Sequence, residues 1–171
     1  MKQTKTHAVE IGIFHRLFLR FLLCYAAAFA AGWLWCVRIS SIPATGNALL
    51  FLLLALLGGF LSVSSPFLLL LTGWKAVLEA QLLYRLLLLA RADEITLLSL
   101  NACLLLLLIT LFVYVTAAAS ACRFSHETYI RDLRLLLSGS CLAYLVRGAC
   151  LAAATLLLKQ LWSYPSAGFP L

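Results

Sequence analysis

Arg147 is the charged side chain that lies deepest in apolar sequence, in the segment LAYLVRGAC at residues 142–150. It falls within one residue of the midpoint of the apolar stretch from Leu135 to Leu158. Insertion of a central arginine costs about 2.5–3.5 kcal/mol, and hydrocarbon offers no acceptors for its N–H groups. We therefore expect Arg147 to point into a helical bundle. Its helical face is small and polar, with Ser140, Ala143, Tyr144, Cys150, Ala154 and Thr155.

Glu79 is the acidic residue that the sequence places inside a predicted apolar segment. A Glu79–Arg147 ion pair would neutralise both charges away from water. Lys75 lies one helical turn from Glu79 and competes for it. In the alternative, Glu79 stays near the interface with Lys75, while Arg147 bonds to carbonyl groups, Asn101 or lipid phosphate.

The sequence motifs give little support for a catalytic function. The sequence contains no H-E-x-x-H helix, no G-x-S-x-G elbow and no phosphate-binding loop. The histidines, His7, His15 and His126, lie in a polar tail or loop, and a proton relay would need a second carboxylate in the membrane. We expect no enzyme, no cofactor and no metal site, and we interpret the six cysteines as small packing residues.

The composition is that of a membrane protein. Of 171 residues, 64% are hydrophobic and 11% are charged, far below the charged content of a soluble domain. The formal charge of +7 is spread over the ends of apolar segments, which indicates membrane topology and no nucleic-acid partner.

The apolar runs predict an all-α bundle of about five transmembrane segments in one domain, 21–159. The expected spans are 21–37, 48–71, 74–90, 95–121 and 135–158, between a basic cytoplasmic tail at 1–20 and a C-terminal stub at 160–171. The third segment has 17 residues, about 25 Å against the ~30 Å hydrocarbon core, so it either crosses or re-enters. Five crossings put eight basic residues inside and three outside, against eight and four for the re-entrant arrangement, a difference too small to decide between them. We favour five crossings with a cytoplasmic N-terminus.

Several residues should shape or line these segments. Pro66 should kink the second span and Gly73 should end it. Gln81 and Arg85 share one face of the third segment, and Asn101 lies near the start of the fourth. Along the fourth span, a stripe of small and hydroxyl-bearing residues suits close helix packing: Thr110, Tyr114, Ala117 and Ala121.

Residues 50–158 resemble the stage II sporulation protein M family. The resemblance rests on SSPFLLLLTGWK, with Pro66, Gly73 and Trp74, and on LLSLNACLLLLL, with Asn101, followed by VTAAASACR. Here Lys75 follows the glycine, whereas a basic residue precedes it in the family. The resemblance implies a membrane scaffold for forespore engulfment that recruits peptidoglycan-degrading partners.

The residues and the resemblance together predict a non-enzymatic scaffold or assembly protein of the cell membrane, in contact with the bilayer and with membrane or cell-wall-remodelling partners. The alternative is a small transporter or a membrane subunit of one. In that case an aqueous pathway would be lined by Glu79, Gln81, Arg85, Asn101 and Arg147, with discontinuous helices near Pro66 and Gly73.

Overall fold

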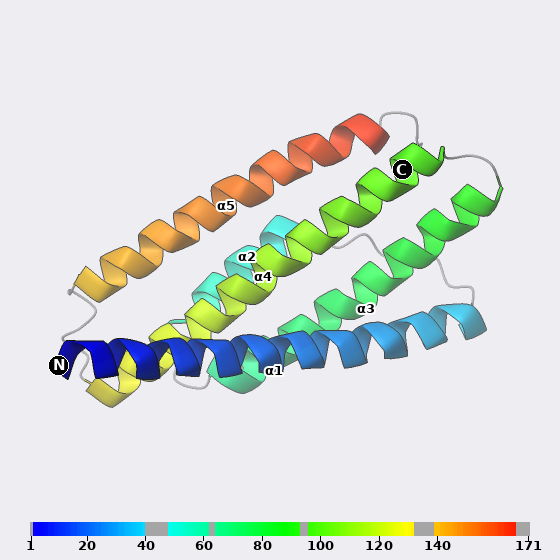
Figure 1. Cartoon of the computed structure of the whole chain (residues 1–171). Coiled ribbons are helices and arrows are strands. Elements are labelled where there is room, and N and C mark those ends of the chain that lie inside the picture. The colour runs from blue at the N-terminus through cyan, green and yellow to red at the C-terminus, as the bar shows by residue number, and fades with distance from the viewer. Residues whose placement is uncertain (1, 40–47, 62–63, 93–95, 132–138, 167–171) are drawn as a thin grey trace.

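The computed structural model describes residues 2–39, 48–61, 64–92, 96–131 and 139–166. These residues form five helices, which are α1 (Lys2–Ile39), α2 (Ala48–Gly58), α3 (Ser64–Arg91), α4 (Leu97–Arg131) and α5 (Gly139–Ser166) (Figure 1). The predicted all-α fold is confirmed. The residues expected as a basic tail, 1–20, form the first half of α1 from Lys2 onward, and the expected C-terminal stub is helical up to Ser166.

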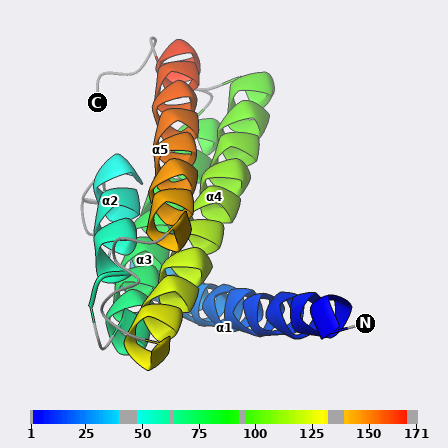
Figure 2. The same cartoon turned by 90° about the vertical axis from the view of Figure 1, so that its left-hand side faces the viewer.

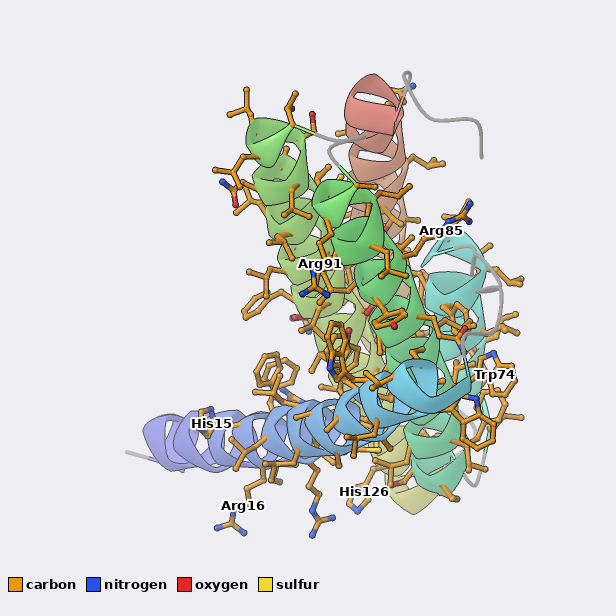
Figure 3. All side chains as sticks on the ribbon, turned by 90° about the vertical axis from the view of Figure 1, so that its right-hand side faces the viewer. His15, Arg16, Trp74, Arg85, Arg91 and His126 are labelled. Carbon is orange, nitrogen blue, oxygen red and sulfur yellow. The ribbon has the colours of Figure 1, made fainter. Side chains whose placement is uncertain are left out.

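Helices α2 to α5 run up and down beside one another, and α1 crosses them obliquely (Figure 2). The N-terminal part of α1 extends beyond the other helices and carries His15 and Arg16, both exposed (Figure 3). The C-terminal part of α1 contacts α3, and the two helices run in the same N-to-C sense (Figure 1). The contacts follow the same order along both helices: Cys24 lies against the Leu69 carbonyl, and Gly32 lies against Val77.

The prediction of one continuous second span over residues 48–71 is wrong. Helix α2 ends at Gly58 and a turn follows, with N–H groups of residues 59–61 bonded to carbonyls of residues 56–58. Helix α3 then begins at Ser64, so Pro66 lies in its first turn and does not kink a span. Proline is favoured there because the first N–H groups of a helix have no partner within it.

The third predicted segment, 74–90, is not short, because it is the second part of α3. Gly73 does not end a helix, since α3 runs through it to Arg91. A glycine within a helix weakens it by only about 0.5–1 kcal/mol, which packing against α1 can offset. The boundary between the two segments therefore lies about ten residues earlier than the sequence suggested.

Membrane character is clear from the helices that the structure describes. Three of their segments are long and apolar enough to cross a bilayer, namely Ile13–Val37, Ser64–Arg91 and Leu97–His126. Leu49–Gly58 and Cys141–Leu157 are shorter apolar helices. Helix α2, with 11 residues, is about 16 Å long and cannot span the ~30 Å hydrocarbon core alone. The chain is therefore a helical membrane protein.

The core lies where the helices meet. Its buried side chains include Phe21 of α1, Phe51 of α2, Leu68 of α3, Tyr114 of α4 and Tyr144 of α5. The predicted stripe on α4 takes part, because Ala117 and Ala121 are fully buried and Thr110 is half-buried. Small residues on α4 let its neighbours approach closely.

Candidate functional site

An ion pair lies near the middle of α3. Lys75 Nζ bonds to Glu79 Oε1 one turn further along the helix, and the side chains are only 4% and 12% exposed. Residues at this spacing lie on the same face of a helix. Helix α3 is 28 residues long, so both charges lie near the centre of this candidate membrane span.

Tyr25 of α1 is the second hydrogen-bond donor to the Glu79 carboxylate. Its hydroxyl donates to Glu79 Oε2, so each oxygen of Glu79 has a donor. Tyr25 is itself buried and stacks on Phe29 of the same helix. The hydrogen bond therefore joins α1 to α3 through a charged acceptor, which makes it stronger than a neutral one.

Tyr114 of α4 covers the other side of the pair. The Lys75 ammonium lies 5.2 Å from the centre of the Tyr114 ring, within the range of a cation–π interaction. Thr72 Oγ1 donates to the Leu68 carbonyl at 2.6 Å and lies 3.5 Å from the Tyr114 hydroxyl. Together, Tyr25, Thr72, Lys75, Glu79 and Tyr114 form what we call the central polar cluster.

Close approach of α1 and α3 lets Tyr25 reach Glu79. A methyl group added at Gly32 would lie 3.0 Å from Val77 Cα and 3.2 Å from Ala80 Cβ, closer than ordinary van der Waals contact. One added at Gly73 would lie 3.8 Å from Ala28 Cβ, which is an ordinary contact. Such small-residue contacts are typical of helix packing in lipid.

The central polar cluster carries no net formal charge, because Lys75 and Glu79 cancel. Each charge would be expensive in hydrocarbon alone, and mutual pairing with added hydrogen bonds reduces that cost. Chemically, the arrangement can hold three helices in one register. It also places a proton-accepting carboxylate between a phenol and an ammonium group.

Arg147 is not directed into the bundle, and the predicted Glu79–Arg147 pair is wrong. Arg147 is exposed, while Glu79 is bound by Lys75 and Tyr25. The reason lies in how α5 docks: its buried face contains Tyr144 and Gly148. At about 100° per residue, Arg147 falls beside that face.

Tyr144 is buried, and it anchors α5 to the turn after α2. Its hydroxyl donates to the Leu56 carbonyl at 2.6 Å, and its ring stacks on Phe124 of α4 with centroids 4.3 Å apart. Ser125 of α4 donates to the Leu61 carbonyl at 2.6 Å. Two hydroxyl groups thus satisfy carbonyls at the point where α2 ends.

The other predicted polar residues do not converge on the central polar cluster. Gln81 and Arg85 are half-buried on α3, and Asn101 is exposed on α4. Arg85 and Arg91 lie along the same helix in Figure 3. The structure therefore does not bring together the set that would line a single pathway through Glu79, Asn101 and Arg147.

Tyr25, Thr72 and Tyr114 were not predicted as members of this site. The alternative pairing of Glu79 with Lys75 is confirmed, and the pair is buried among the helices. The four-residue spacing of Lys75 and Glu79 was the available signal. Glycine is typical of a helix end, so the sequence predicts a boundary beside Lys75, whereas α3 continues through both residues.

The cysteines contribute packing. Cys36, Cys103, Cys122 and Cys141 are buried, Cys24 is half-buried, and all of these are free thiols, as is the exposed Cys150. Cys24 Sγ lies 3.6 Å from the Leu69 carbonyl at the α1–α3 contact. These positions fit the interpretation of cysteine as a small, weakly polar packing residue.

Comparisons with protein-family models, with curated proteins and with solved structures find no match for this chain. The resemblance to the stage II sporulation protein M family therefore stays a prediction.

Proposed function

We propose that this protein is a non-enzymatic scaffold or assembly subunit of a membrane complex. The observation that carries the proposal is the exposed position of Arg147 inside the apolar helix Cys141–Leu157. A guanidinium left against lipid is unfavourable by about 2.5–3.5 kcal/mol at the centre of a span. Assembly with another membrane protein removes that penalty.

The central polar cluster supports the same proposal from inside the bundle. Tyr25 and Lys75 each donate to one oxygen of Glu79, and the Tyr25 bond ties α1 to α3. A bundle whose internal charges are mutually satisfied is a rigid support, and its lateral face on α5 is free to meet a partner. On the resemblance alone, that partner would be a cell-wall-remodelling protein in forespore engulfment.

The test is whether the protein fixes a partner in the membrane. The tagged full-length chain, expressed at its native level and crosslinked in membranes, should co-purify with a membrane protein in constant stoichiometry. Deleting this chain should lower the level of that partner or displace it. A chain that purifies alone, with no membrane protein altered by its deletion, would contradict the proposal.

The buried charge pair also favours a second candidate, a small transporter, because ionisable groups inside membranes often mark ion or proton paths. Purified protein in sealed vesicles distinguishes the two functions. A scaffold should give the same proton and ion flux for the wild type, for Glu79→Gln and for empty vesicles. Flux that depends on Glu79 would establish the transporter and remove the scaffold as sole function.

A further inference from the structure

We propose that Arg147 is the docking point for a transmembrane helix of a different protein, one that carries an aspartate or glutamate at the same depth. This inference rests on the proposed function and specifies the chemistry of the partner. Three observations carry it: the position of Arg147, the acidic residues of the chain, and the side chains beside the guanidinium.

Arg147 lies too deep to be an interfacial residue. In the apolar helix Cys141–Leu157 it is about 9 Å from one end and about 15 Å from the other, at 1.5 Å per residue. The apolar sequence continues before Cys141 from Leu135. Among the side chains that the structure describes, none forms an ion pair or hydrogen bond with Arg147.

Among the residues that the structure describes, the candidate spans hold no free carboxylate that could pair with Arg147. The chain contains six acidic residues, and Glu79 is the one inside a candidate span, where Lys75 and Tyr25 already bind it. The other five lie outside the candidate spans: Glu10, Asp93, Glu94, Glu127 and Asp132. A second copy brings the same candidate spans, in which Glu79 is already bound, so we assign the compensating charge to a different protein.

The face around Arg147 permits a helix to come close. Ala143 and Cys150, at positions one turn before and one turn after, are exposed, and Ala154 on the same side is half-buried. Small residues at this spacing let two backbones approach in lipid. A carboxylate on the incoming helix can then form paired N–H···O bonds with the guanidinium.

The experiment uses the full-length protein and a defined helix in phosphatidylcholine vesicles. The helix is a leucine/alanine transmembrane peptide with one central glutamate, and its matched control has glutamine at that position. Energy transfer between labelled protein and labelled peptide reports association. We expect the glutamate peptide to bind about tenfold more tightly than the glutamine peptide, an effect of the size seen for strong interhelical hydrogen bonds.

Variants of the protein assign the effect to Arg147. Arg147→Leu should abolish the preference for the glutamate peptide, and Arg147→Glu should reverse it toward a peptide with a central lysine. Arg85→Leu, which removes another cation from the bundle, should leave the preference intact. The Arg147→Glu reversal is a gain of binding, so a folding defect cannot mimic it.

Three results would overturn the inference. Equal binding of the glutamate and glutamine peptides would show that Arg147 is satisfied by lipid phosphate. A preference that survives in Arg147→Leu would place the docking point elsewhere. Self-association of the protein that is lost in Arg147→Leu would make a second copy the occupant.

The same variant in native membranes separates this inference from the proposed function. If a partner co-purifies equally well with wild type and Arg147→Leu, the scaffold function stands and the docking point fails. If no partner co-purifies with the wild type, the scaffold function itself fails, whatever the peptides do.

Discussion

Two charged sites on the described helices lie in apolar surroundings, and they differ in where the compensating charge comes from. At the α1–α3–α4 contact, Lys75 and Glu79 lie on one helix and receive further contacts from Tyr25 and Tyr114. On α5, Arg147 is exposed and has no described partner in the chain. The first site is complete within one molecule, and we propose that another molecule completes the second.

The comparison shows that charged groups with a similar cost in hydrocarbon can have different roles. A buried pair whose partners are four residues apart forms as soon as its helix forms, so it stabilises the folded chain and offers nothing to a partner. An unpaired arginine adds nothing to the isolated chain, but it favours any complex that supplies a carboxylate. Internal pairing thus supports the fold, and external pairing selects the partner.

The largest expected effect comes from breaking the internal pair. Lys75→Leu leaves the Glu79 carboxylate buried with Tyr25 as its remaining donor, and we expect it to lower the free energy of unfolding by about 3–5 kcal/mol. Arg147→Leu in the purified chain should change it by no more than about 0.5 kcal/mol, as exposed substitutions usually do. Unfolding by dodecyl sulfate in mixed micelles measures both.

The double variant Lys75→Leu with Glu79→Leu sharpens this result. Replacing both members of a buried pair by apolar residues is often neutral, so most of the lost stability should return. If Arg147→Leu destabilises the isolated chain as much as Lys75→Leu does, the contrast between the two sites is lost.

The second expected effect concerns the hydroxyl that joins α1 to the pair. Tyr25→Phe removes one donor from the Glu79 carboxylate and should cost about 1.5–3 kcal/mol, as hydrogen bonds to charged groups do. The melting temperature of the protein in detergent should fall accordingly.

Tyr84→Phe is the matched control for Tyr25→Phe. Its ring contacts Trp33 edge-on, with centroids 5.6 Å apart, and phenylalanine keeps that contact. We expect a shift close to zero. Equal shifts for the two variants would mean that the Tyr25–Glu79 bond contributes nothing beyond ring packing.

The sequence was sufficient to predict the helical membrane class, the starts of α4 and α5 within four residues, and the packing stripe on α4. Helices α4 and α5 continue ten and eight residues beyond the predicted ends. These follow from composition and from periodicity, which are local signals. It was not sufficient to place the boundary between α2 and α3. Proline and glycine are typical of helix ends, so Pro66 and Gly73 predict a break in the helix. Proline in the first turn, however, favours a helix.

That one boundary also explains why the site was missed. With a helix end at Gly73, Lys75 falls at the end of a segment, whereas with a helix start at Ser64 it lies near the centre of α3. The predicted orientation of Arg147 was wrong for a different reason. Both faces of α5 carry small residues, Ala143 and Cys150 on one and Gly148 on the other, and periodicity alone cannot say which face meets α2 and α4.

The smallest expected effects come from two glycines, one at each region. Gly32→Ala places a methyl group 3.0 Å from the Val77 backbone, and since backbone cannot rotate away, we expect a loss of about 1–3 kcal/mol, as for other overpacked contacts. Gly148→Ala places one 3.3 Å from the two methyl groups of Leu56. That side chain can move, and the gain in helix propensity of about 0.5–1 kcal/mol offsets the adjustment, leaving a change near zero.

The same unfolding titration compares the two glycine variants. A larger loss for Gly32→Ala means that the α1–α3 contact around the charge pair is the rigid part of the bundle and that α5 docks through adaptable side chains. This matches their roles, because a fixed contact keeps Tyr25 against Glu79, while an adaptable one lets α5 adjust when a partner helix meets Arg147. A larger loss for Gly148→Ala would reverse that assignment and make α5 the rigid element.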